Sequence, residues 1–393
     1  MNPKPTLLIL HNKYLQKGGE DTVVQNEISI LQTNGYTVYY KEFNNQDIHS
    51  LKPGILLMPL NFFFNFASFF QVYFLVKKHK IQVVHVHNFF YTASPSVFWA
   101  AKAAGAATVI TVHNYRLFCL NGYFFKKGET CFQCHTKKSF STGIHEKCFR
   151  SSAISSNVLA LSTNFHRKIH TWKNKVDQFI VINPFMPQLL QDIGIPAKKI
   201  FVKPNFLATQ KTESIPDYRD RDDFYLFVGR LSEEKGIRQL ILAFEKMQKK
   251  LVIAGDGDLR NFVIEHTSPT IQYKGLLPKE EITDLYTSCK ALVFPSLWIE
   301  GMPMTIIEAQ SSGAIPIVAS SVTTEKIVDH GVNGFLYTPG NEADLLSVID
   351  LFESLSIESL NTLSKNVQAH FLKTHSSEQH TKAITAIYSK LSA

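Results

Sequence analysis

Short apolar runs alternate with amphipathic stretches along most of the chain. In the first half, these runs lie at residues 6–10, 37–40, 83–87, 108–112 and 178–182. Near-continuous apolar runs of this length are typical of parallel strands that are buried on both faces. Between them, apolar residues recur at the spacing of a helix, as at Val23, Val24, Ile28 and Leu31. This alternation predicts an α/β protein with a parallel sheet.

The same pattern restarts after a charged stretch at residues 218–223, which has no periodicity and is typical of a linker. Further strands are predicted at 200–202, 225–228, 251–254, 271–275, 291–294 and 315–319. Helices are predicted at 237–247, 279–288, 344–354, 357–371 and 378–391. A chain of 393 residues exceeds the usual size of a single hydrophobic core. We therefore expect two domains, one over 1–204 and one over 205–371.

Composition and charge narrow the class of protein and of partner. With 45% hydrophobic and 19% charged residues, the chain is of the globular type and not disordered. Residues 1–204 hold 23 Lys and Arg against nine Asp and Glu, a net charge of +14, whereas the remainder carries −6. The N-terminal half is therefore expected to face a membrane surface, a phosphate-bearing acceptor or nucleic acid. Nucleic acid ranks last, because the chain has none of the recognised nucleic-acid-binding motifs.

Residues 55–76 contain no charged side chain and are rich in Phe. The run is long enough to span a bilayer, but polar residues and Pro59 interrupt it. It is followed by Lys77, Lys78 and Lys80, and an aromatic helix with a basic flank favours a position at the membrane interface. A buried core helix and a true span are the alternatives. The first eleven residues have too short an apolar core for a signal peptide, so we expect a cytoplasmic location, including the inner face of the membrane.

The stretch at residues 294–313 reads F-P-S-L-W-I-E-G-M-P-M-T-I-I-E-A-Q-S-S-G and follows an apolar strand. Pro303 is suited to the start of a helix, whose first N–H groups then form a site for phosphate. Glu300 precedes that helix and Glu308 lies in its second turn, about 12 Å further along by helical rise. This separation suits a nucleotide-sugar, which has an anionic centre and hydroxyl groups at both ends. A capped helix with two surface acids is the alternative.

Four other loops carry candidate chemistry at the carboxyl ends of strands. Arg230 and Lys235 share a glycine-flanked loop and could balance a diphosphate, although solvated surface charges would give the same pattern. Gly18 and Gly19 open a helix and allow close approach of a ligand to the backbone. His113 follows a strand at the rim where α/β sheets bind ligands. Residues 271–278 form a short strand and loop at the same rim, suited to seat a flat base.

Four of the five cysteines crowd into one insert at residues 119–148. A C-x-x-C pair flanked by two single cysteines is able to close a tetrahedral zinc site, with no open position for catalysis. The expected ligands are Cys119, Cys131, Cys134 and Cys148, with His135 and His145 as substitutes. Two disulfides are the alternative for an oxidising compartment.

Together these motifs resemble glycosyltransferase family 4, whose GT-B fold has two facing Rossmann-like domains and a deep cleft. The matching segments are G-G-E at 18–20, T-V-H-N at 111–114, F-V-G-R-L-S-E-E-K-G at 227–236, A-G-D-G at 254–257, E-G-M-P-M-T-I-I-E-A at 300–309 and G-V-N-G-F-L at 331–336. They follow the order of the family and span nearly the whole chain. Met302 stands where the family usually has Phe, which is a volume-conserving change.

The resemblance implies a retaining, metal-independent hexosyl transfer from a UDP-, GDP- or ADP-sugar to an acceptor hydroxyl group. It assigns Glu300 and His113 to the sugar, Glu308 to the ribose, and Arg230 and Lys235 to the leaving diphosphate. It also implies that the last helix, at 372–393, crosses back to the first domain. The donor-binding residues are expected to be Gly18, Gly19, Gly229, Gly275, Leu276, Gly301, Met302, Pro303, Met304, Thr305 and Glu308.

The acceptor is less narrowly indicated than the donor. A basic N-terminal domain with an aromatic helix suits a lipid-linked or surface-polysaccharide glycan at an anionic membrane. Two other classes compete with this interpretation. A sugar-nucleotide epimerase of the same fold uses different acidic motifs, and a zinc-stabilised membrane- or partner-binding protein without catalysis is expected to lack Glu300, Arg230 or Lys235, which are all present.

Overall fold

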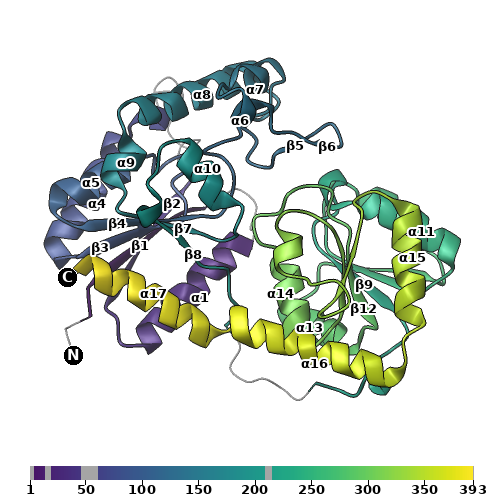
Figure 1. The fold of residues 1–393 in the computed structure, drawn as a ribbon. Helices are drawn as coiled ribbons and strands as arrows, with labels where there is room; N and C mark the ends of the chain where they lie inside the picture. The colour runs from purple at the N-terminus through teal and green to yellow at the C-terminus, as the bar shows by residue number, and fades with distance from the viewer. Residues whose placement is uncertain (1–3, 14–18, 46–60, 209–214, 393) are drawn as a thin grey trace. The chain divides into compact units, whose positions relative to one another are not determined.

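The computed structural model describes residues 4–13, 19–45, 61–208 and 215–392 (Figure 1). The chain divides into two compact units. The first comprises 1–123, 132–208 and 377–393, and the second comprises 124–131 and 209–376. The segment 124–131, which the sequence analysis counted with the first domain, thus groups with the second. Each unit contains a six-stranded sheet, and all strand pairs within these two sheets are parallel.

The sheet of the first unit has the strand order β2-β1-β3-β4-β7-β8. Its strands are β1 (Leu7–Lys13), β2 (Val38–Asn44), β3 (Val83–Val86), β4 (Ala107–Val112), β7 (Gln178–Val181) and β8 (Ile200–Val202). The longer helices around it are α1 (Gly19–Thr33), α4 (Phe66–His79), α5 (Ser96–Ala104), α8 (Ala153–Lys168) and α17 (Ser377–Ser392). Shorter helices are α6 (Gln133–Thr136), α7 (Ser141–His145), α9 (Thr171–Lys175) and α10 (Met186–Asp192).

The sheet of the second unit has the order β11-β10-β9-β12-β13-β14. Its strands are β9 (Tyr225–Val228), β10 (Leu251–Ala254), β11 (Ile271–Gly275), β12 (Ala291–Phe294), β13 (Pro316–Ala319) and β14 (Phe335–Tyr337). Its helices are α11 (Ile237–Met247), α12 (Arg260–Glu265), α13 (Lys279–Ser288), α14 (Met304–Ser311), α15 (Glu342–Glu353) and α16 (Ile357–Thr374). A two-stranded hairpin, β5 (Phe125–Lys126) and β6 (Glu129–Thr130), lies within the cysteine insert and was not predicted.

The central strands form as they do because their side chains are buried on both faces. Leu7, Leu8, Ile9 and Leu10 of β1 are fully buried, as are Leu292 and Val293 of β12. Parallel pairing brings the carboxyl ends of all strands to one edge of each sheet, where the loops that follow them gather. This edge carries the candidate residues of both units.

The last helix, α17, packs onto the first unit. Its side chains Ile384, Ile387 and Tyr388 are buried in one cluster with Leu7 and Val83 of the sheet. Figure 1 shows α17, in yellow, beside α1, in purple, and the two helices are in contact. The chain thus returns to its first unit after completing the second.

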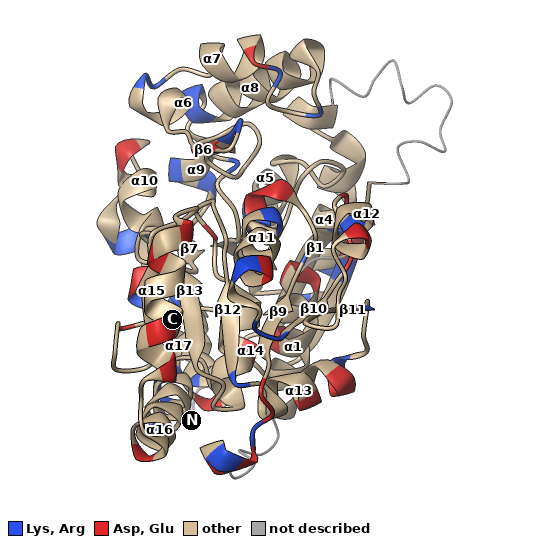
Figure 2. Cartoon of the chain, turned by 90° about the vertical axis from the view of Figure 1, so that its right-hand side faces the viewer, with Lys and Arg blue, Asp and Glu red and all other residues tan. Residues whose placement is uncertain are grey.

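The charge difference between the two halves is visible on individual helices. Helix α9 of the first unit contains Lys173 and Lys175, whereas the first turn of α13 in the second contains Glu280 and Glu281 (Figure 2). Among the described residues, no helix is long and apolar enough to cross a bilayer.

Candidate active site

Glu300 is held in place in the loop that follows β12. Its Oε1 accepts hydrogen bonds from Lys235 Nζ at 2.6 Å, Ser296 Oγ at 2.7 Å and Trp298 Nε1 at 2.8 Å. The backbone carbonyl of Glu300 also accepts from Thr323 Oγ1 at 2.9 Å. The side chain is 7% exposed. These contacts restrain both the rotamer and the orientation of the carboxylate.

A glycine allows the loop of Lys235 to reach Glu300. Gly236 follows Lys235 with a φ of +68°, and a Cβ there would lie 2.0 Å from the carbonyl oxygen of Pro295. No other residue fits this approach without a shift of the backbone. The ammonium of Lys235 also lies 5.2 Å from the centre of the Trp298 ring. The close approach of the two loops therefore depends on Gly236, which has no side chain.

Helix α14 begins at Met304, shortly after Glu300. Pro303 is its N-cap and provides no side-chain hydrogen bond, so the first amides of α14 are not capped by that residue. In the second turn, Glu308 Oε2 accepts a hydrogen bond from Tyr286 Oη at 3.2 Å. Burial raises the pKa of Glu308, and the bond from Tyr286 partly offsets this rise. Met302 packs against the neighbouring core, consistent with its role as a volume-conserving replacement.

Further candidates of the second unit lie in the loop after β9 and at the end of β11. Arg230 is 47% exposed and lies 4.0 Å from Glu234, so about half of its side-chain surface stays in contact with solvent. Gly229 is approached closely by Gly255, where a Cβ would lie 1.8 Å from the Gly229 carbonyl oxygen. Gly275 has a φ of +70° with open space around it, and Leu276 is 76% exposed. The side chains of Arg230 and Leu276 are thus accessible to a ligand.

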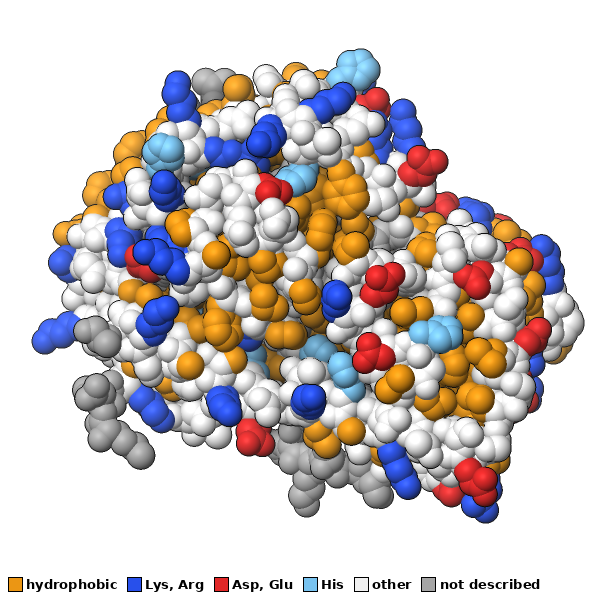
Figure 3. All heavy atoms as spheres, in the orientation of Figure 1, with side chains coloured by type: hydrophobic (Ala, Val, Ile, Leu, Met, Phe, Trp, Pro, Cys, Tyr) orange, Lys and Arg blue, Asp and Glu red, His pale blue; other side chains and the backbone are white. Residues whose placement is uncertain are grey.

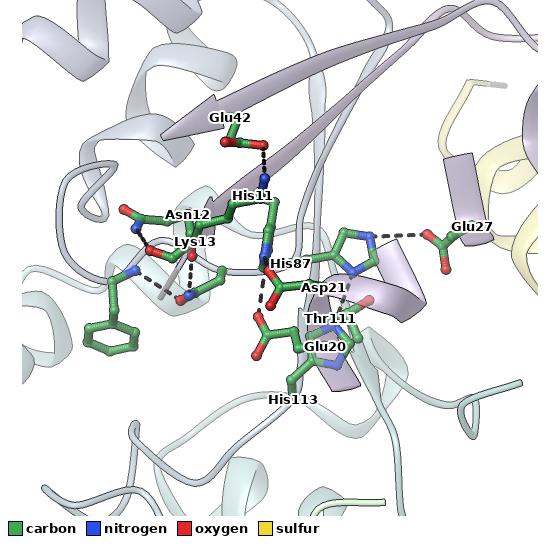
Figure 4. Close-up of polar contacts among 12 residues, drawn as sticks. His11, Asn12, Lys13, Glu20, Asp21, Glu27, Glu42, His87, Thr111 and His113 are labelled. Atoms are coloured by element: carbon green, nitrogen blue, oxygen red, sulfur yellow. Dashed lines mark hydrogen bonds and ion pairs between the residues drawn. The ribbon is translucent and has the colours of Figure 1, made fainter. Parts of the chain in front are cut away.

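His113 lies in the first unit, directly after β4. Its Nε2 is 3.0 Å from Nδ1 of His87, which follows β3, and the two rings are stacked (Figure 4). Burial is the main factor that lowers the pKa of His113 well below its usual value, and the nearby His87 and His11 add to the effect. Gly19 is the first residue of α1, and Gly18 lies outside the described residues. Gly19 and His113 thus belong to the first unit, whereas Arg230, Lys235, Glu300 and Glu308 belong to the second.

Sequence reasoning missed an acidic cluster beside His113. His11, near the end of β1, contacts Asp21 with Nε2 at 2.9 Å, and its Nδ1 lies 3.7 Å from Glu20. Burial, together with the charge of Asp21, raises the pKa of Glu20 to about 8. Glu20 was visible as the third residue of the G-G-E motif. Its burial depends on how α1 docks onto the sheet, which local sequence does not reveal.

The four cysteines of the insert do not come together as a ligand set. Among the described residues, no group of three or more ligand atoms within 4.8 Å of one another includes a cysteine. Of the two substitutes, His135 contacts Asp192 at 3.0 Å and the His145 side chain is 87% exposed. Zinc at these thiols stays a prediction, which metal analysis of the purified protein tests.

Comparisons with known proteins agree on one family. Residues 25–211 match the family model "Glycosyltransferase Family 4", and residues 210–370 match "Glycosyl transferases group 1". The chain is 25% identical over 231 residues to alpha-galactosylglucosyldiacylglycerol synthase of Streptococcus pneumoniae, covering 53% of the chain and 61% of that protein. It is 29% identical over 189 residues to lipopolysaccharide 1,6-galactosyltransferase of Salmonella typhimurium, covering 44% of the chain and 52% of that protein.

Solved structures show the same fold at low sequence identity. A glycosyltransferase from Rickettsia africae matches with a TM-score of 0.70 and 16% identity, over 99% of this chain and 98% of that one. Anabaena HepE in complex with UDP matches with a TM-score of 0.68 and 16% identity, over 98% of this chain and 100% of that one. The two family models adjoin and cover most of the sequence, and the two parallel-sheet units agree with these structures. The chain therefore belongs to the glycosyltransferases of family 4 and has the GT-B fold.

Proposed function

We propose that this glycosyltransferase transfers a hexosyl group from a nucleoside-diphosphate sugar, with retention of configuration, to a lipid-linked or surface-polysaccharide glycan. One observation carries the proposal. The buried carboxylate of Glu300 and the ammonium of Lys235 lie 2.6 Å apart, just before the N-terminus of α14. Such a site offers an acceptor for sugar hydroxyl groups beside two features that favour phosphate, a cation and a helix N-terminus.

The proposed roles follow from the charge changes during transfer. When the bond between the anomeric carbon and the phosphate oxygen breaks, negative charge develops on the diphosphate. Lys235 and the accessible Arg230 offset this charge, which is the role that a divalent cation has in other transferases. We therefore expect transfer to persist in the presence of EDTA. Glu308 is proposed to accept hydrogen bonds from the ribose hydroxyl groups.

A thermal-shift screen with UDP-, GDP- and ADP-sugars tests the donor. We expect one base to raise the melting temperature, because a ligand that binds only the folded state stabilises it, and the stabilisation grows with the affinity. The matched variant Lys235→Ala should weaken that shift, since it removes a cation from the diphosphate site. Transfer of the sugar from the stabilising donor to a glycolipid acceptor is then measured. A protein that none of these nucleotides stabilises would not have the proposed donor site.

The acceptor proposal depends on α4, because its surface suits an anionic bilayer. Phe66, Phe70 and Phe74 are 67%, 52% and 62% exposed, and their spacing of four residues places them on one face of the helix. The opposite face, with Val72 and Val76, is buried. Figure 3 shows hydrophobic side chains along the edge of the first unit that holds α4 and α5.

Charge complements this aromatic face. The last turn of α4 contains Lys77, Lys78 and His79, and Lys80 is its C-cap. The helix has no acidic residue in its first turn, and Asn65 caps it by accepting from the Ser68 amide. The cap explains why α4 begins at Phe66 although the apolar run is longer. Residues 55–60 of that run lie outside the described residues. Exposed aromatic rings beside lysines favour the interface of an anionic membrane.

Reversing the charge of Lys77, Lys78 and Lys80 to Glu should release the protein from vesicles that contain phosphatidylglycerol. Each lost lysine weakens the free energy of binding to such a surface by about 1 kcal/mol. The partition coefficient should therefore fall at least about 100-fold. Vesicle co-sedimentation measures it. The control reverses three other exposed lysines of the first unit, Lys137, Lys138 and Lys198, and should bind nearly as the parent does. Equal release by both triple variants would indicate a net-charge effect and contradict a role for α4.

A further inference from the structure

A second cluster of buried charge lies in the first unit, apart from the residues that the proposed function uses. Its centre is Glu27 of α1, which is 0% exposed. Glu27 Oε1 lies 3.1 Å from His85 Nδ1 and 3.2 Å from His87 Nε2. Glu27 Oε2 lies 3.2 Å from Lys203 Nζ and 3.1 Å from His380 Nε2. Three segments far apart in the chain, which contain His85 and His87, Lys203, and His380, thus surround one carboxylate.

The charges in this cluster are balanced by Lys203. Burial by itself would raise the pKa of Glu27, but the ammonium of Lys203 and the two nearby histidines outweigh it and hold the pKa well below its usual value. Burial, with help from the adjacent His85, lowers the pKa of His87 to about 3. Burial lowers the pKa of Lys203, and the neighbouring Glu27 partly offsets this fall. At neutral pH the cluster therefore contains an ionised Glu27, paired with Lys203, and a neutral His87.

This balance argues against a bound metal ion. Glu27, His85 and His87 are close enough together to share an ion. However, both ring nitrogens of His85 already have partners, with Nδ1 2.7 Å from Tyr388 Oη and Nε2 2.8 Å from Thr111 Oγ1. Lys203 supplies the positive charge that an ion would bring. We therefore assign no metal to this cluster. Through His87, the cluster contacts His113.

Elementary hydrogen-bond chemistry fixes the position of each proton. An ionised carboxylate only accepts, so the nitrogen of His87 that faces Glu27 must carry the proton. The contact does not have ideal hydrogen-bond geometry, yet the opposite tautomer would set a lone pair against a carboxylate at 3.2 Å. Because His87 is neutral, its Nδ1 is unprotonated. The Nε2 of His113, 3.0 Å away, must then donate to it.

The geometry points to a relay in which Glu27 and His87 position His113 as a hydrogen-bond acceptor. With Nε2 protonated, neutral His113 presents an unprotonated Nδ1, which forms no hydrogen bond with any described residue. His113 itself is only partly buried, so a ligand can reach it. A lone pair on Nδ1 accepts from a hydroxyl group and repels a phosphate oxygen. This inference rests on the proposed function, in which His113 contacts the sugar, and it specifies a hydroxyl donor on that sugar.

The first test is spectroscopic and needs no substrate. In protein labelled with ¹⁵N-histidine, long-range ¹H–¹⁵N correlation spectra distinguish the two tautomers of each imidazole, and His113→Asn identifies the signal. We expect His113 to be protonated at Nε2 in the parent protein. In His87→Leu, which removes the acceptor, the spectrum should shift toward a mixture of tautomers. Protonation at Nδ1 in the parent, or no change in His87→Leu, would overturn the relay.

Kinetic measurements separate positioning from a merely structural role. His87→Leu should lower kcat about 10-fold, the loss expected for one neutral hydrogen bond, and should leave the affinity for the free nucleoside diphosphate unchanged. His87→Asn places a carbonyl oxygen near the position of Nδ1 and should restore much of kcat. The matched control is His370→Leu, which makes the same chemical change at a partly buried histidine of α16, outside the cluster. It should change neither the tautomer of His113 nor kcat. Equal loss of kcat in His87→Leu and His370→Leu would contradict the proposal.

The design distinguishes a failed relay from a failed function. If no sugar nucleotide is turned over by the parent protein, the proposed function fails while the spectra still decide the tautomer. If turnover is normal but His113 carries its proton on Nδ1, the relay alone fails. If His87→Leu does not fold, the parent spectrum and His87→Asn still test the prediction.

Discussion

Changing Glu300 to Gln should reduce kcat by about 10²–10³-fold while the protein stays folded. Removing one preorganised electrostatic group from an active site typically costs this much. The glutamine oxygen can still accept from Lys235, Ser296 and Trp298, so the loop keeps its shape. The negative charge is lost, and with it the strong acceptor for the donor sugar. Turnover with the stabilising nucleotide-sugar measures the effect, and circular dichroism checks the fold.

The matched control for this substitution is Glu342→Gln. Glu342 begins α15 and pairs with Lys246 at 2.7 Å on the surface of the second unit. The chemical change is the same, but the residue is not part of the site, and an exposed pair contributes little to stability. It should keep the kcat of the parent. Normal turnover by Glu300→Gln would contradict the proposal that this carboxylate binds the donor sugar.

The second large effect is expected for Arg230→Ala, with a fall in kcat of about 10²-fold or more. Arg230 is 47% exposed and its nearest acid, Glu234, is 4.0 Å away, so its removal leaves no buried group without a partner. Its proposed contribution is therefore made in the complex, to the charge on the leaving diphosphate. The fall should appear in kcat more strongly than in KM, because that charge develops during transfer.

Arg238→Ala supplies the comparison for this second prediction. Arg238 lies in the first turn of α11 and pairs with Glu233 at 3.0 Å, at an exposure similar to that of Arg230. Its loss should leave kcat within a factor of about 2. Arg230→Lys should recover part of the activity, since it restores the charge without the planar fork. Full activity in Arg230→Ala would mean that another group neutralises the diphosphate.

The strand pattern and the motifs of the second unit were predicted well because they depend on nearby residues. The order strand, loop and helix around Glu300 follows from the apolar run at 291–294, from Pro303 and from helical spacing after it. The fold class and family also followed from the sequence and are confirmed. The restraint of Glu300 by Lys235 was not predicted, because the two residues meet only where Gly236 lets one loop reach another.

In the first unit, fewer features of the site were predicted, again because they depend on contacts between residues that are distant in the sequence. The apolar run at 55–76 predicted an aromatic helix, but only the structure shows that Phe66, Phe70 and Phe74 face outward while Val72 and Val76 face the core. The cysteine spacing predicted a zinc site, yet the described geometry brings no three of these thiols together. Spacing along the chain limits which ligands are able to meet, and backbone packing decides which do.

The sequence by itself determined that this chain is a family 4 glycosyltransferase of two α/β units, because periodicity and loop motifs are local properties. Only the tertiary structure decided the environment of the ionisable groups. Glu27 meets Lys203 and His380 across separations of more than a hundred residues, through the docking of α1 and α17 on one sheet. Burial and neighbouring charge set which of these groups are ionised, and both depend on packing between distant segments.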